Sequence, residues 1–226
     1  MTPSPPAGVP GPNLTVKQQR AASRAKKLDE YRRQQQRAVR NRRIGIVAGI
    51  VGAVAVVALV VVSVVVTPRP ASYSAGGEGK SIAGVSTFTN TAGHVETPVT
   101  YAQTPPAGGE HHPMWLNCGV YDRAVPNENA VHALEHGAIW VTYEPSLSDD
   151  ELKTLTSTLP STYVVLSPYE GLPSPIVLSG WNVQLRVDKA SDPRIPQFFE
   201  ENWKSLTVPE PGALCTGALD APGKVA

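Results

Sequence analysis

Residues 127–143 read NENAVHALEHGAIWVTY, and this stretch joins a short amphipathic helix to an apolar strand. Asn127 is suited to cap a helix, Glu128 falls in its first turn, and Gly137 follows its end, so a helix of about nine residues is predicted. Residues 138–143 are apolar on both faces, which is typical of a central strand. The fold is therefore expected to be built around this helix and strand.

Further elements follow this stretch. Ser148 and Glu151 form a capping box that opens a second helix, and the buried strand 162–166 comes after Pro160. Residues 181–188 alternate between apolar and polar and predict a half-exposed strand, and Asp192-Pro193 starts the last helix. Upstream, the turn-rich segment 85–126 contains one expected strand, 99–101. This order predicts an α/β (α+β) two-layer domain with a small mixed sheet.

Ile44 to Val66 is a run of 23 uncharged residues, interrupted only by Ser63. As a helix it would extend about 35 Å, which is enough to cross a hydrocarbon core of about 30 Å. The run is too long and begins too late for a signal peptide, and no small-residue cleavage site follows it. The sequence therefore predicts one transmembrane helix.

The charges are distributed unequally around this helix. Of the 20 Lys and Arg residues, 11 lie between Lys17 and Arg43, whereas the rest of the chain has 9 basic and 17 acidic residues. The positive-inside rule then places the N-terminus in the cytoplasm and the C-terminal domain outside. The basic tail is expected to contact anionic lipid of the bilayer, and nucleic acid is not an expected partner.

The predicted organisation has four parts. They are a basic cytoplasmic tail (1–43), in which 1–16 are expected to be disordered and 17–43 could form a juxtamembrane helix, the transmembrane helix (44–66), a Pro/Gly/Ser-rich linker (67–81) and an extracytoplasmic domain (82–226) of the cell membrane or envelope. Gly45 and Gly49 have the G-x-x-x-G spacing that would let two such helices pair into a homodimer. Cys118 and Cys215 both lie in the exported part, so a disulfide between them is expected.

All five histidines lie between His94 and His136. His132 and His136 are four residues apart, so they share one face of the predicted helix and can bind one metal ion. His111, His112 and Met114 in the preceding loop offer further donors. Histidine with methionine or thiolate would favour copper, and histidine with carboxylate would favour zinc. The alternative is a non-catalytic interaction domain, in which the histidines bond loop carbonyls at a structural joint.

Residues 132–136 (HALEH) also match H-x-x-E-H, a zinc protease pattern in which two histidines bind zinc and the glutamate activates water. Such a site needs a third ligand, for which Glu200 or Glu201 would have to serve. A zinc-dependent hydrolase is therefore the third hypothesis, after metal binding and the interaction domain.

Three segments support a resemblance to a known family: VTYAQTPPAGGEHHPMWLNCGVY (99–121), NENAVHALEHGAIWVTYEP (127–145) and SGWNVQL (179–185). The region from His94 to near Cys215 resembles the bacterial family called domain of unknown function 3105, which is common in actinobacteria. The resemblance implies a membrane-anchored domain that faces outward. It implies no activity and assigns no functional residues.

Overall fold

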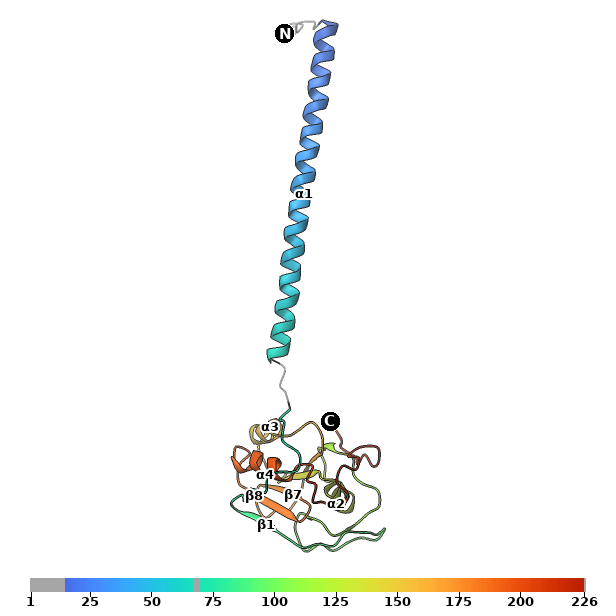
Figure 1. The fold of residues 1–226 in the computed structure, drawn as a ribbon, viewed down its shortest axis with the longest axis vertical. Coiled ribbons are helices and arrows are strands. Elements are labelled where there is room, and N and C mark those ends of the chain that lie inside the picture. The colour runs from blue at the N-terminus through green and yellow to red at the C-terminus, as the bar shows by residue number, and fades with distance from the viewer. Residues whose placement is uncertain (1–14, 67–69, 226) are drawn as a thin grey trace, which may run out of the picture. The chain divides into compact units, whose positions relative to one another are not determined.

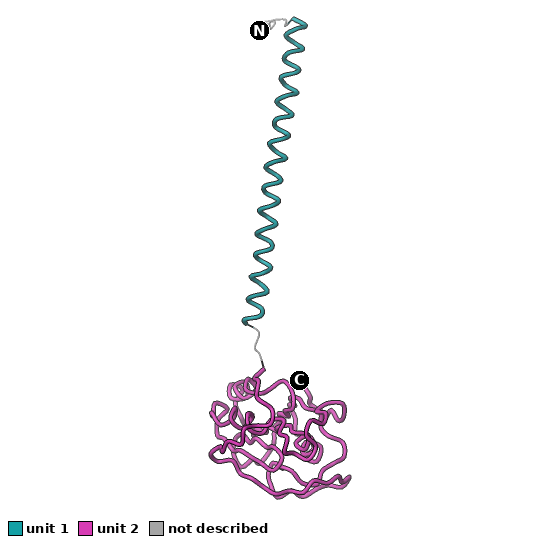
Figure 2. The backbone as a smooth tube through the Cα atoms, in the orientation of Figure 1, with its two compact units in different colours: residues 1–67 teal, residues 68–226 magenta. Residues whose placement is uncertain are grey.

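The computed structural model describes residues 15–66 and 70–225, and the chain divides into two units, 1–67 and 68–226 (Figures 1 and 2). The first unit is described as one helix, α1 (Val16–Val66), which includes the basic segment and the apolar run. Residues 1–14 of the predicted disordered tail and 67–69 of the predicted linker lie outside the described residues. Among the described helices, α1 is the one long and apolar enough to cross a membrane.

The second unit is built on a mixed six-stranded sheet with the order β1-β8-β7-β5-β6-β4. Strand β5 (Ile139–Tyr143) lies inside it, parallel to β6 (Val164–Pro168) and antiparallel to β7 (Ile176–Gly180). Strand β8 (Val183–Val187) joins β7 to β1 (Val85–Thr87), and β4 (Gly119–Val120) forms the other edge. The predicted α+β class with a small mixed sheet is confirmed.

Helices pack on both faces of the sheet. Successive side chains of β5 point to opposite faces, so they join different apolar clusters. Ile139 and Val141 belong to one apolar cluster with residues of α3 (Asp149–Ser157) and α4 (Arg194–Asn202). Trp140 belongs to a second cluster, with residues of α2 (Asn127–Glu135) and both cysteines. Strand β5 therefore lies between the apolar cluster that includes α3 and α4 and the apolar cluster that includes α2.

Two expectations about strands were wrong. Residues 99–101 form no strand, since the Val99 amide donates to the Glu128 carboxylate at 3.0 Å instead of to a neighbouring strand. Strand β7 was not predicted, and the strand predicted at 181–188 begins at Val183. Trp181 and Asn182 instead form the tight turn between β7 and β8, where Asn182 has a positive φ of 62°.

The folded unit begins before the predicted boundary at residue 82. Ala71 bridges to Pro160, and the Tyr73 ring stacks on Phe199 with centroids 4.9 Å apart. The Tyr73 hydroxyl also donates to the Thr158 carbonyl at 2.6 Å. The described part of the predicted linker is thus packed against the domain.

Candidate metal centre

Helix α2 and the residue directly after it provide three residues of the site, and backbone geometry determines both ends of the helix. It begins after Pro126, while the Asn127 side chain donates to the Tyr169 hydroxyl at 3.4 Å, so the predicted Asn127 cap was wrong. At the other end, Gly137 has a φ of 93°. The amides of Gly137 and Ala138 bond the carbonyls of Leu134 and Ala133 at 2.9 and 3.0 Å. This is a Schellman motif, so the expected glycine end of the helix is confirmed.

Both faces of α2 are buried. Ala130, Ala133 and Leu134 pack into the second apolar cluster. The polar residues of the other face, His132, Glu135 and His136, are only 2–3% exposed. Buried ionisable groups require partners, so this face must be satisfied by residues from elsewhere in the chain.

A short ladder brings two more histidines to α2. Strand β2 (Gly93–His94) pairs in parallel with β3 (Glu110–His111), and the register places His94 opposite His111. His111 is fully buried, whereas the His94 side chain is 44% exposed. The ring centroids of His94 and His111 both lie 4.8 Å from that of His132. Three histidines from separate segments thus form one group.

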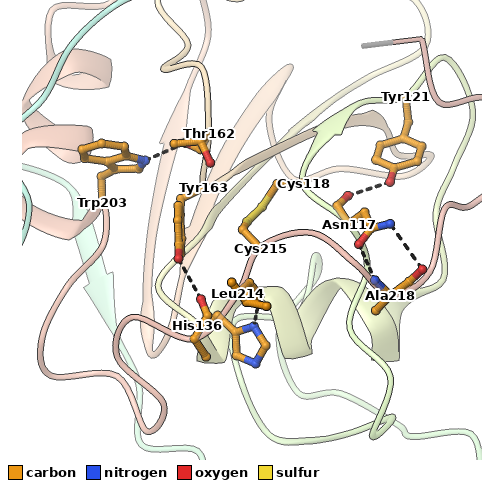
Figure 3. Close-up of a disulfide and its surroundings, with 11 residues drawn as sticks. Asn117, Cys118, Tyr121, His136, Thr162, Tyr163, Trp203, Leu214, Cys215 and Ala218 are labelled. Carbon is orange, nitrogen blue, oxygen red and sulfur yellow. Dashed lines mark hydrogen bonds between the residues drawn. A yellow bond between two sulfur atoms is a disulfide. The ribbon is translucent and has the colours of Figure 1, made fainter.

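The Nδ1 atoms of the three buried histidines each contact a backbone carbonyl at 2.7 Å. His111 bonds Gly109, His132 bonds His112, and His136 bonds Leu214 (Figure 3 shows the last of these). A carbonyl oxygen only accepts, so each Nδ1 must carry the proton. In a neutral imidazole this leaves the Nε2 lone pair free, which is the arrangement found in histidines that bind metals.

The Nε2 atoms of His94, His111 and His132 converge on Glu135. Its Oε2 lies 2.8 Å from His111 Nε2, 3.5 Å from His94 Nε2 and 3.9 Å from His132 Nε2. When Nδ1 of His111 carries the only proton of the ring, its Nε2 and the carboxylate are both acceptors. Two acceptors at 2.8 Å require a shared proton or a cation between them.

The electrostatic environment favours the ligand forms of these groups. Burial, with added contributions from the surrounding histidines, lowers the pKa of His132 to about 4, although its bond to the His112 carbonyl acts in the opposite direction. Burial alone would raise the pKa of the Glu135 carboxyl, but the hydrogen bond with His111 and the charges of His111, His132 and His94 together outweigh burial, so the net pKa is below its ordinary value. Metal ligation requires neutral imidazole and ionised carboxylate. The lowered pKa values of His132 and Glu135 favour these two forms.

A second group adjoins the first. His136 Nε2 lies 3.3 Å from Glu210 Oε2, and the ring centroids of His132 and His136 are 4.7 Å apart. The Glu210 amide donates to the Glu135 carbonyl at 3.2 Å, which fixes the backbone of Glu210 beside α2. The ligand atoms within each group, His94/His111/His132/Glu135 and His132/His136/Glu210, lie within 4.8 Å of one another.

The structure brings together three of the five predicted metal ligands: His111, His132 and His136. His112 contributes its carbonyl to His132, while its ring accepts the Met114 amide at 3.0 Å. The His112 ring belongs to neither of the two groups, and Met114 is 46% exposed.

Three potential ligands were not among the predicted set: His94, Glu135 and Glu210. All histidines lie in one window, which was a signal for His94. Glu135 lies on the same predicted helix as His132, which was a signal for Glu135. No motif in the sequence indicated Glu210.

Cys118 and Cys215 form a disulfide, with Cα atoms 5.4 Å apart (Figure 3). The Cys118 amide also donates to the Cys215 carbonyl at 2.7 Å. Leu214, whose carbonyl accepts from His136, directly precedes Cys215. The disulfide therefore fixes the segment that orients His136, and it leaves Cys118 without a thiolate for ligation.

The hydrolase hypothesis required Glu200 or Glu201 as a third zinc ligand. Glu200 instead accepts the Ser74 amide at 2.9 Å, and Glu201 accepts the amides of Glu78 and Lys80 at 3.0 and 2.9 Å. Glu135, which would have to activate water, is engaged by His111. The required third ligand is thus bonded elsewhere.

No curated protein and no solved structure matches the chain. A family model, described as a protein of unknown function (DUF3105), matches residues 94–217, which include all the histidines, Glu135, Glu210 and both cysteines. Because the match covers more than half of the chain, the protein belongs to this family.

Proposed function

We propose that the protein is a single-pass membrane protein whose exported domain binds a divalent transition-metal ion through His94, His111, His132 and Glu135. The observation that carries this proposal is the set of histidine hydrogen bonds. The Nδ1 atoms of His111 and His132 are both bonded to carbonyls, so their Nε2 lone pairs face one buried carboxylate. A cation between these atoms satisfies all of them at once.

The spacing of the ligand atoms suits such an ion. Bonds of about 2.0 to 2.1 Å in a tetrahedron place ligand atoms about 3.3 Å apart. The separations of 2.8, 3.5 and 3.9 Å from Glu135 Oε2 lie on both sides of this value. These three separations therefore differ from the tetrahedral value by about half an ångström.

The donor types favour zinc or copper(II). Imidazole nitrogen suits both ions, and a carboxylate oxygen adds a harder donor. Copper(I) prefers thiolate and thioether ligands, but Cys118 is in a disulfide and Met114 is 46% exposed. Three histidines with one carboxylate thus match zinc most closely.

The proposed topology rests on α1 and its flanking charges. The side chains of the apolar section of α1 are exposed, and a helix that is apolar on all sides is stable in lipid but not in water. The 11 basic residues before Ile44 favour the cytoplasmic side for the N-terminus. A disulfide in the domain agrees with an oxidising compartment outside the membrane.

Metal analysis of the full-length protein in detergent tests the proposal. After exposure to zinc and dialysis, the wild type should retain zinc, and His111→Asn and Glu135→Gln should lose most of it. The asparagine nitrogen can replace Nδ1 toward the Gly109 carbonyl while Nε2 is removed. His112→Asn is the matched control, because it also removes one histidine ring but should retain the metal.

One observation favours a second candidate, the non-catalytic interaction domain. A protonated His111 would satisfy Glu135 at the observed 2.8 Å without any metal, as a buried ion pair that stabilises the joint between β3 and α2. In that case the wild type would purify metal-free, and added zinc or copper would not shift its melting temperature.

A further inference from the structure

We propose that His132, His136 and Glu210 form a second divalent-cation position beside the first, so that the domain holds a pair of metal ions. This inference rests on the proposed function, because the two positions share His132. The ligand atoms of the second group lie within 4.8 Å of one another. Its members come from α2, from the cap residue directly after α2, and from the C-terminal segment.

His136 is built in the same way as His111. It is 2% exposed, and its Nδ1 donates to the Leu214 carbonyl at 2.7 Å. Its Nε2 lone pair therefore faces Glu210 Oε2 at 3.3 Å, where a proton or a cation must lie between two acceptors. The domain thus repeats a buried imidazole facing a carboxylate, once with Glu135 and once with Glu210.

The segment that contains Glu210 is fixed on several sides. Its amide bonds the Glu135 carbonyl, the Tyr163 hydroxyl donates to the Ala213 carbonyl at 2.8 Å, and the disulfide holds Cys215 (Figure 3). The Glu210 side chain is nevertheless 48% exposed. An ion at this position would therefore have preorganised ligands and direct access from solvent.

The shared histidine determines how the two positions fill. His132 uses Nδ1 for the His112 carbonyl, so it has one lone pair, on Nε2, and can bind one ion. With one ion, His132 completes the group of four donors around Glu135. With two ions, it joins His136 and Glu210, and the first ion keeps His94, His111 and Glu135.

Each ion then has three protein ligands, which leaves a coordination position for an external ligand, as in catalytic zinc sites. The Trp115 ring packs against both histidines of the second position. Its ring centroid lies 5.1 Å from that of His136 and 5.8 Å from that of His132. Its buried Nε1–H has no acceptor among the described residues, and buried donors of this kind normally have a partner. Water, hydroxide or a small carboxylate on the second ion would provide the acceptor.

Titration of the metal-free full-length protein with Zn²⁺ in detergent tests the inference, with bound zinc counted by native mass spectrometry and calorimetry. The wild type should bind two zinc ions, the second roughly ten-fold or more weakly because it enters beside a bound cation. His136→Asn and Glu210→Gln should each bind one ion with the affinity of the first. His111→Asn should lose the tighter ion, and His112→Asn should still bind two.

Each outcome decides between the two proposals. No bound zinc in the wild type overturns the proposed function itself. One zinc in the wild type leaves the proposed function standing and overturns the second position. Two zinc ions in His136→Asn would place the second ion elsewhere and overturn the assignment. With Cu²⁺ as the probe, two ions in the wild type should give a half-field electron paramagnetic resonance signal that His136→Asn lacks.

Discussion

Replacing Cys118 and Cys215 with serine removes a cross-link between residues 97 positions apart. In the chain-entropy model, closing a loop of about 100 residues stabilises a protein by about 4.7 kcal/mol at 25 °C. The loop contains five of the six strands of the main sheet and helices α2, α3 and α4, so loss of the cross-link frees most of the unfolded domain. We expect the free energy of unfolding to fall by about 3 to 5 kcal/mol in the double variant.

The same variant should affect the two metal positions unequally. The carbonyl that orients His136 belongs to Leu214, next to Cys215, whereas the carbonyl that orients His111 belongs to Gly109, outside the cross-linked loop. Zinc binding that depends on His136 and Glu210 should therefore weaken more than binding that depends on His111 and Glu135.

Urea unfolding of the metal-free full-length protein in detergent measures the first effect. Tryptophan fluorescence is a suitable signal, because all four tryptophans lie in the second unit. Reduced wild type is the control and should match the double variant. Equal unfolding free energies of oxidised wild type and double variant would refute the reasoning, as would two free thiols alkylated in denatured, unreduced wild type.

Three further predictions concern topology, pH and the core. Protease added to intact cells should digest the region after residue 70 and leave the tail before Arg43 protected; cleavage within the tail would contradict the orientation. The pKa of His132 is lowered to about 4 from an ordinary 6.5, so between these values the unfolded chain binds more protons than the folded one. The unfolding free energy of the metal-free protein should therefore fall by up to roughly 3 kcal/mol as the pH drops from 6.5 to 4. His132→Asn should show a smaller fall. Identical pH profiles of wild type and His132→Asn would contradict the lowered pKa of His132. Leu134 is fully buried, so Leu134→Ala should lower the unfolding free energy by about 2 to 5 kcal/mol in urea melts; a loss below 1 kcal/mol would show that α2 is not packed as described.

The main fold was predictable where one local signal determined the structure. Gly137 ended α2 as expected because a positive φ suits glycine. The apolar run at 139–143 became the central strand because both of its faces are buried. Strand β7 was missed although residues 176–178 are apolar, since the preceding prolines and glycine at 171–175 resembled a loop.

The site was predictable only in part, because its geometry depends on long-range contacts. The spacing of His132 and His136 placed both on α2, but their carbonyl partners come from residues 112 and 214. The pairing of His94 with His111 uses two strands of two residues each, which are too short to show a periodic pattern. Glu210 reaches the site through a backbone bond to Glu135 that no motif encodes.

X-ray absorption spectroscopy at the zinc edge, on full-length protein loaded with one equivalent of zinc, tests the central claim most directly. We expect nitrogen and oxygen neighbours at about 2.0 to 2.1 Å. Their outer-shell scattering should correspond to three imidazoles, and His112→Asn should leave the spectrum unchanged. A sulfur neighbour at about 2.3 Å, or zinc surrounded only by oxygen, would contradict a centre built from His94, His111, His132 and Glu135.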